Sequence, residues 1–480
     1  MKLPQLFSKN RRFSFRLPAI LALAVVTLLV VFLSGRLIRQ TVEKPDPVVT
    51  RRAPTTGEPE TERSDFGGLT VTVLYSDAER TSGFYASAAP TLMARGDSEE
   101  MEMLETEYGL TLRFSKTTNA SALLSQSEAS GDVPADILAL PISGDLSELL
   151  ARGMLEDLSS HASIDLSHPA YDSEENAPAP VGGKRYLLTG AFLVGYRDAA
   201  SAVIYDKTAL SAFYRPEQLP TALVADGKWT YDAMNRILSE MNSGINAEEP
   251  FYQMRIGKED APFFWISSGA DPVGENGDGT FSVQADGEDP FRRLTVLRDK
   301  IYESPYRISG SDGPDNAVFY FGTLGRYGEA DRERCALLPM PKAEEDGGTS
   351  YRSAVLADRA TAAAVPKGAA DPGSAAAALN FLFCRSYERY RGEYAADLCG
   401  EDKTDAEMLS LILSGTVLGP LDEFGYGEIL YSVVSDAVTK TDGAYPTETS
   451  LLKNLRKRGT ALEFAINVLS EKAAENNANS

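Results

Sequence analysis

Residues 69–77 read LTVTVLYSD, and this stretch decides the fold class. β-Branched and apolar side chains alternate along it after the pair Gly67-Gly68, which predicts a buried first strand. The strand ends in the polar residues Ser76 and Asp77, and polar residues at the end of a strand are typical of the entrance to a binding cleft. We therefore take this strand as the start of a sheet and work outward from it.

The next elements extend the sheet. An acidic segment, SEEMEMLETEYG, predicts a helix that closes at Gly109, and a second strand follows over 110–114. The segment VPADILALPIS (133–143) predicts a third strand, and a short helix then stops near Gly153. Strands that alternate with helices across short links indicate a doubly wound α/β fold.

The second half of the chain carries further elements of both kinds. Thr230, in the stretch GKWTYDAM, is a candidate N-cap for a helix that ends at Gly244, and residues 271–283 predict a turn-rich hairpin. A helix is expected from about Gly373, and the chain from about Glu401 reads as helical. At 480 residues the chain exceeds the usual single-domain range, so we expect two lobes.

The N-terminus has the charge order of a signal anchor. Five basic side chains lie within residues 1–16, and no charged residue occurs from Leu17 to Leu33. We expect 1–16 to be a cytoplasmic basic segment, 17–35 a transmembrane anchor and 36–66 a disordered linker. The globular part then lies on the extracytoplasmic face of the cell membrane. A cleaved signal peptide and a secreted protein are the alternative.

Charge excludes one class of partner. Residues 1–66 hold 11 of the 47 basic and 6 of the 69 acidic side chains, so 36 basic and 63 acidic residues remain, a net charge of −27. Such a surface repels nucleic acid and anionic headgroups. We therefore expect no nucleic-acid partner.

The usual hydrolase and metal motifs are absent from the sequence. It has two histidines and no HExxH, GxSxG or Walker A motif, so we expect no catalytic residue, metal or cofactor. Three cysteines are an odd number for an exported chain, and a disulfide between Cys384 and Cys399 is one alternative.

Aromatic side chains at predicted strand ends and loops point to carbohydrate. Aromatic faces stack on the C–H faces of sugars, while charged and polar groups pair with the hydroxyls. The predicted ligand-binding residues are Tyr75, Ser76, Asp77, Tyr85, Trp265, Arg326, Tyr327 and Tyr351. Taken singly, each aromatic is better explained by core packing, so only the set as a whole carries the prediction.

Several local patterns occur in a familiar order. They are TVTVLYSD, EYGLTLRF, GDVPADILAL, ARGMLEDLSS, AVIYDKTAL, GKWTYDAM, LLPMPK and AAAVPKGAADPGSAAAALNFL. In this order they resemble extracellular solute-binding proteins of bacterial ABC importers, particularly the sugar-binding group related to maltose-binding protein. The resemblance covers nearly all of residues 67–390.

The resemblance implies the two-lobed periplasmic-binding-protein type II (Venus flytrap) fold. Lobe 1 would comprise 67–195 and 335–385, and lobe 2 would comprise 196–334 and 386–480. Hinge crossings are expected near Tyr196–Ala202 and near Arg334–Leu338. Two lobes would close on a small solute, here a sugar or oligosaccharide, and a membrane permease would recognise the closed form.

Two tryptophan positions of the family bear on the expected site. In Gly325-Arg326-Tyr327 the family commonly has Gly-x-Trp, so Tyr327 would take the stacking role and Arg326 adds a charge. Trp229 stands at the helix start that the family places near the cleft, and we expect it to anchor packing rather than contact the solute.

Two other functions stay open at this stage. A membrane-tethered glycan-processing enzyme would turn over an oligosaccharide, although catalytic histidines and metal motifs are absent from the sequence. A ligand sensor of the same fold would bind a solute and report to a membrane partner other than a permease.

Overall fold

The structure is a computed structural model. It describes residues 65–76, 99–117, 119–120, 122–123, 133–171, 181, 183–190, 193–245, 250–277, 280–309, 317–345, 348, 350–356, 360–418 and 420–478. The predicted cytoplasmic segment and membrane anchor, and almost all of the predicted linker, lie outside the described residues. Within them, no helix combines the length and apolar character needed to cross a bilayer.

The first sheet has the order β12-β3-β1-β2. Strand β1 (Leu69–Tyr75) pairs in parallel with β2 (Leu110–Lys116) on one side and with β3 (Ile137–Pro141) on the other. Helix α4 (Glu99–Tyr108) precedes β2, and β12 (Thr361–Ala364) adds to β3 in the antiparallel sense. The predicted strand–helix–strand–strand start of an α/β fold is confirmed.

Burial explains why these residues form the sheet. Residues Ile137 to Leu140 of β3 are fully buried, as in a strand that is covered on both faces. Gly109 ends α4 with φ +62°, and a Cβ there would lie 2.9 Å from the backbone nitrogen of Gly68. Only glycine fits this left-handed, close-packed position.

The second sheet has the order β10-β4-β9-β5-β8. The strands are β4 (Ser201–Asp206), β5 (Gln253–Arg255), β8 (Arg307–Ile308), β9 (Ala317–Thr323) and β10 (Cys335–Leu338). The predicted division placed residues from 335 in the first lobe, whereas β10 pairs with β4 and belongs to the second sheet. The chain therefore returns to the first sheet after Leu338, between β10 and β12.

Helix α10 (Tyr231–Asn242) shows how the sequence sets the second half of the fold. The Thr230 side chain accepts a hydrogen bond from the Ala233 backbone nitrogen at 3.2 Å, so the predicted N-cap is confirmed. Trp229 is fully buried, and its Nε1–H donates to the Pro339 carbonyl at 2.9 Å. The expected packing role of Trp229 is confirmed.

Shorter elements complete the described structure. Strands β6 (Val273–Glu275) and β7 (Phe281–Val283) form the predicted hairpin, and β11 (Ser353–Val355) pairs in parallel with β13 (Thr416–Leu418). The remaining helical segments are η2 (Ile142–Leu146), α6 (Ser147–Ala151), η3 (Leu158–Ser160), η4 (Pro169–Tyr171), α7 (Val194–Asp198), α8 (Lys207–Ser211), η5 (Pro216–Gln218), α9 (Pro220–Ala225), η6 (Lys258–Asp260), α11 (Ala261–Ser267), α12 (Glu288–Leu297), η7 (Arg298–Tyr302) and α13 (Leu324–Gly328).

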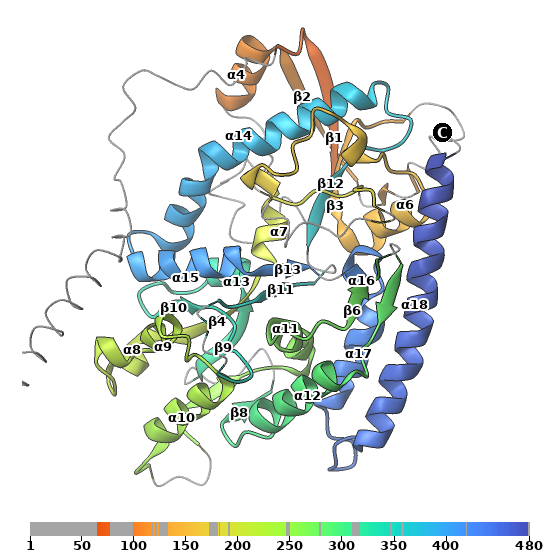
Figure 1. The fold of residues 1–480 in the computed structure, drawn as a ribbon. Coiled ribbons are helices and arrows are strands. Elements are labelled where there is room, and N and C mark those ends of the chain that lie inside the picture. Colours follow the sequence, from red (N-terminus) through yellow and green to blue (C-terminus); the bar gives the residue numbers. More distant parts are fainter. Residues whose placement is uncertain are drawn as a thin grey trace, which may run out of the picture. The chain divides into compact units, whose positions relative to one another are not determined.

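The C-terminal helices pack on elements from several parts of the described chain (Figure 1). They are α14 (Pro372–Cys399), α15 (Lys403–Ser414), α16 (Pro420–Glu423), α17 (Gly427–Ala437) and α18 (Glu448–Ala478). Helix α15 packs on β10, α16 on η2, and α18 on both α6 and β7. The predicted lobe boundary at residue 385 falls inside the 28-residue helix α14.

The cysteines are free thiols. Cys384 and Cys399 lie in the same helix, α14, which separates them by about 22 Å along its axis. A disulfide needs Cα atoms within about 7 Å, so the disulfide alternative is wrong.

A buried carboxylate ties α15 to the second sheet. Asp405 is 2% exposed and accepts hydrogen bonds from the Tyr327 hydroxyl at 2.5 Å and from the Leu337 backbone nitrogen at 3.0 Å. Burial raises the pKa of the Asp405 carboxyl above its ordinary value, against the effect of these two donors. Helix α15, β10 and α13 are thus held together by one side chain.

This carboxylate predicts a pH dependence of stability. Because the pKa of Asp405 is higher in the folded than in the unfolded chain, folding takes up a proton, and the folded state loses stability as pH rises through the raised pKa. We expect the free energy of unfolding of the parent, relative to Asp405→Asn, to fall as pH is raised from about 4 toward 7. Urea titrations across that range measure the difference, and a difference that does not change with pH would contradict it.

Candidate functional site

The order of the first sheet marks one edge of it as the place for a ligand. The chain passes from β1 to β2 on one side and then to β3 on the other side of β1. In open α/β sheets, ligands bind outside the carboxyl ends of the strands at such a reversal. The residues there are Tyr75 and Ser76 at the end of β1, and Ser143 and Gly144 after β3.

The segment after β3 is bent at this edge. Gly144 has φ +87° and Ser143 an extended conformation, so the backbone does not continue directly into α6. The Gly144 backbone nitrogen donates to Ser147 Oγ at 3.2 Å, which fixes the bend. The bend leaves Ser143 half-buried at the rim of a cavity.

The opposite wall comes from the second half of the chain. Glu259 of η6 is exposed, and it is followed by Pro262 and Phe263 of α11, which are buried. The Gly257 backbone nitrogen donates to Asp260 Oδ2 at 2.7 Å, and its carbonyl accepts from the Tyr302 hydroxyl at 2.7 Å. Both bonds hold η6 in place, which positions Glu259.

A tight turn between α16 and α17 forms the third wall. Gly425 has φ +71°, and a Cβ there would lie 2.5 Å from Ser147 Oγ. A Cβ at Gly427 would lie 2.5 Å from Asp422 Oδ1, so the turn packs closely both on α6 and on its own carboxylate. Asp422 is 2% exposed and accepts a short hydrogen bond from the Tyr431 hydroxyl.

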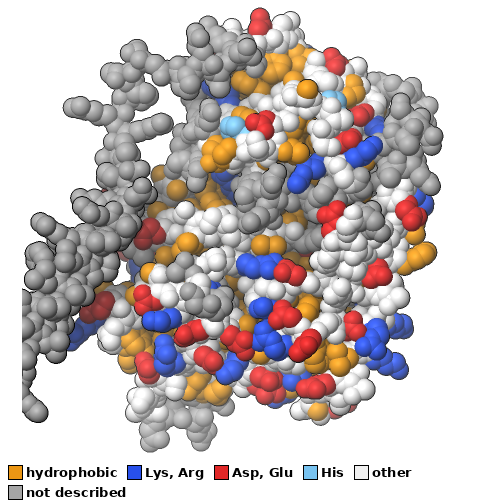
Figure 2. Space-filling model, viewed as in Figure 1, with side chains coloured by type: hydrophobic (Ala, Val, Ile, Leu, Met, Phe, Trp, Pro, Cys, Tyr) orange, Lys and Arg blue, Asp and Glu red, His pale blue; other side chains and the backbone are white. Residues whose placement is uncertain are grey.

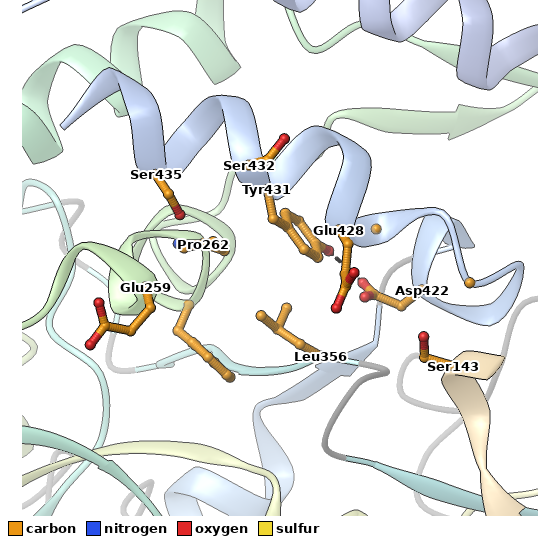
Figure 3. A pocket seen from close by; sticks show the side chains of 12 residues that line it. Ser143, Glu259, Pro262, Leu356, Asp422, Glu428, Tyr431, Ser432 and Ser435 are labelled. Atoms are coloured by element: carbon orange, nitrogen blue, oxygen red, sulfur yellow. Dashed lines mark hydrogen bonds between the residues drawn. The ribbon is translucent and has the colours of Figure 1, made fainter. Parts of the chain in front are cut away.

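These three walls enclose a pocket of about 280 Å³ (Figure 3). Its volume is just below the range of about 300 to 1,000 Å³ for small-molecule sites. The lining residues are Ser143, Glu259, Pro262, Phe263, Leu356, Asp422, Gly425, Gly427, Glu428, Tyr431, Ser432 and Ser435. Figure 3 shows Glu428 close to Asp422, with Glu259 on a separate element.

The lining has a consistent chemistry. It carries three carboxylates, three serine hydroxyls and a tyrosine hydroxyl above apolar side chains, and no lysine or arginine. Carboxylates accept hydrogen bonds from hydroxyl groups, whereas an anionic solute would meet repulsion without a compensating cation. The pocket therefore suits a small solute rich in hydroxyl groups and without negative charge.

Three of the predicted ligand contacts lie in the core. Trp265 is fully buried, and its Nε1–H donates to the Pro290 carbonyl at 2.8 Å. Tyr327 is fully buried on Asp405, and Tyr351 is 3% exposed, with its hydroxyl donating to the Val224 carbonyl at 3.2 Å. Their rings pack against protein atoms in this conformation and are not available to stack on a sugar.

The other predicted contacts divide between two places. Tyr75 is half-buried, with its ring centroid 6.4 Å from that of Phe114, and Ser76 is 8% exposed at the end of β1. Arg326 is exposed on α13. None of these three lines the described pocket. Asp77 and Tyr85 lie outside the described residues, so their role stays a prediction.

The pocket residues that sequence reasoning missed come from two kinds of position. Ser143 ends the third predicted strand, so the rule that located Ser76 would also have located it. Asp422, Glu428 and Tyr431 lie in a turn and helix that the sequence marks only as helical, and they carry no motif. Among the described residues, no group of three or more His, Cys, Asp or Glu could hold a metal ion.

Comparison with known proteins identifies the fold. No protein-family model matches the chain, and no curated protein matches it by sequence. Many solved structures are similar to this chain, and three of them are described here. They are the sugar-binding protein MalE from Xanthomonas citri (13% identity, TM-score 0.52, 84% of this chain and 98% of that one), an ABC substrate-binding protein from Listeria monocytogenes in complex with cycloalternan (13%, 0.51, 82% and 98%), and the galacto-N-biose-/lacto-N-biose I-binding protein of an ABC transporter from Bifidobacterium longum in complex with lacto-N-biose (11%, 0.51, 84% and 98%).

These likenesses extend over nearly the whole length of each relative and most of this chain. The chain has the two-lobed α/β fold of MalE-like binding proteins, and the resemblance stated from the sequence is confirmed at the level of the fold.

The buried state of Trp265 gives a prediction that separates packing from ligand contact. We expect Trp265→Ala to lower the free energy of unfolding by about 3 to 5 kcal/mol, because it leaves a large cavity. Trp265→Phe keeps most of the ring and should cost about 1 kcal/mol for the lost hydrogen bond. Urea denaturation measures both. An alanine variant with parental stability and weakened solute binding would show instead that the ring is a ligand contact.

Proposed function

We propose that the chain is an extracytoplasmic solute-binding protein, which captures a small carbohydrate in the described pocket. The observation that carries the proposal is the composition of that pocket, which has carboxylates and hydroxyls but no basic side chain among its lining residues. Sugar hydroxyls donate to carboxylates, and the C–H faces of a sugar ring rest on apolar side chains such as Phe263 and Leu356.

The origin of the walls supports capture by closure. Ser143 follows a strand of the first sheet, whereas Glu259 precedes α11 in the second half of the chain. A solute that contacts both sides favours the conformation in which they are close, so binding shifts the equilibrium toward the closed form. Capture of this kind needs no chemical step, and the proposed function is binding without catalysis.

The fold supports a transport role. The similar protein from Bifidobacterium longum is the binding protein of an ABC transporter, and that from Listeria monocytogenes is an ABC substrate-binding protein. By likeness of fold, we propose that this chain delivers its solute to the permease of an ABC-type importer. The predicted anchor at 17–35 would keep it at the outer face of the cell membrane.

A thermal-shift screen tests the binding proposal. We expect a sugar to raise the melting temperature of the full chain in detergent, because a solute at a hundred times its Kd adds about 2.7 kcal/mol of stability. Glu428→Gln should weaken that sugar's binding by roughly 10- to 100-fold, since a charge-assisted acceptor is lost. Glu217→Gln, at an exposed carboxylate of η5 that does not line the pocket, is the matched control.

The outcomes of the screen are distinct. Amino acids or peptides that stabilise the chain where sugars do not would contradict the carbohydrate proposal. If chromatography shows that the protein hydrolyses or transfers the bound sugar, the protein is an enzyme and not a binding protein.

Membrane attachment is tested separately. We expect the full chain to sediment with membranes after a high-salt wash and to be released by detergent, because a helix of this length inserts by burial of apolar surface. Deletion of residues 17–35 should leave the protein soluble. A shortened, soluble product from the unmodified chain would show cleavage and secretion.

A further inference from the structure

The surface of α18 carries a feature that the pocket does not use. The buried side of this helix is a regular stripe: Leu451, Leu455, Leu462 and Ile466 are at most 2% exposed. The opposite side, at the same helical spacing, carries Lys453, Lys457, Thr460 and Phe464, which are all exposed. The helix is therefore amphipathic, but its solvent face carries a large apolar side chain, Phe464, together with lysines.

Two observations distinguish this solvent face. Phe464 is 73% exposed, the highest value for a large hydrophobic side chain among the described residues. It lies seven residues after Lys457 and eleven after Lys453, on one line along the helix. Arg456 and Arg458, the sequence neighbours of Lys457, are also exposed. Figure 2 shows Lys and Arg side chains gathered at the right-hand edge, where Figure 1 places the lower part of α18.

Nearby carboxylates neutralise only part of this charge. Arg456 forms an ion pair with Asp286 at 2.8 Å, and Glu463 is engaged by the Val283 backbone nitrogen at 2.8 Å. The Glu463 bond turns its carboxylate toward β7. The lysine side of the helix is left with net positive charge in a chain whose globular part is strongly acidic.

We propose that this face, defined by Lys453, Lys457 and Phe464, rests on an anionic phospholipid surface. Lysines attract acidic headgroups, and a phenylalanine between them can enter the boundary between headgroups and acyl chains. The helix itself does not insert, because its apolar stripe is already buried in the protein. The contact is made by side chains that project from a rigid helix.

The net acidic charge of the chain does not prevent such a contact. Charges are screened over about 10 Å at 0.1 M salt, so a membrane at the α18 face responds to the local lysines rather than to distant carboxylates. The inference rests on the proposed membrane anchor. A linker of about 31 residues has a root-mean-square end-to-end distance of about 30 Å, so an anchored chain stays close to the membrane surface. The high effective concentration of that surface lets a weak contact between α18 and the lipid form.

Tryptophan fluorescence in nanodiscs tests the inference. Native Trp229 and Trp265 are fully buried, so Phe464→Trp adds a reporter that alone meets solvent. The full chain carrying this substitution is reconstituted through its own N-terminal segment into nanodiscs of brominated phosphatidylcholine, with or without brominated phosphatidylglycerol. We expect the added emission to be quenched in the discs that contain phosphatidylglycerol, and quenching to disappear at about 0.5 M salt.

Charge reversal supplies the second arm. Lys453→Glu with Lys457→Glu should abolish the quenching, whereas reversal of the exposed Lys228 and Lys403 should leave it unchanged. Melting temperatures near that of the parent confirm that the variants are folded. The inference is overturned if no quenching is seen in either lipid. It is also overturned if quenching is equal in both lipids and does not change when Lys453 and Lys457 are reversed. Failure of the chain to enter nanodiscs at all would instead refute the anchor.

Discussion

The antiparallel pairing of β12 with β3 is the constraint on which the rest of the fold depends. It joins Thr361–Ala364 to residues 138–141, more than two hundred positions earlier in the chain. The chain must therefore leave the first sheet, build the second one and return before the first sheet is complete. Because of this route, elements that are distant in sequence, such as Ser143 and Glu259, line the same pocket.

Close backbone packing then decides the shape of that pocket. Gly425 and Gly427 stand where any side chain would collide with Ser147 or Asp422, so the α16–α17 turn sits directly on α6. The turn buries one carboxylate and presents another, Glu428, to the cavity. A pocket made in this way has acceptors for hydroxyl groups and no cation for an anion. Its selectivity follows from which side chains the turn leaves exposed.

The parts of the fold that could be read from the sequence are those with local causes. Alternation predicts β1, a hydroxyl at the helix start predicts the Thr230 cap, and the turn-rich segment 271–283 predicts the β6–β7 hairpin. The placement of β10 could not be read, because its membership of the second sheet depends on pairing with β4. The disulfide alternative failed because the length of α14 was not apparent.

The candidate site was harder to predict for the same reason. Aromatic side chains are typical of sugar sites, and the sequence offers Trp265, Tyr327 and Tyr351. In the structure each of them has a hydrogen-bond partner in the core, a backbone carbonyl or a carboxylate, that could not be predicted from the spacing of residues in the sequence. Asp422 and Glu428 have no motif and reach the pocket only through the turn. The sequence and the pocket therefore lead to the same proposed ligand chemistry through different residues.

The most direct test is a crystal structure of the protein with the sugar that stabilises it most. If the pocket is the binding site, electron density for the sugar will lie within hydrogen-bonding distance of Glu428 and Ser143, between the two halves of the fold. Density for the sugar at another position, with this pocket empty, would contradict the assignment of the site and the selectivity derived from its charge.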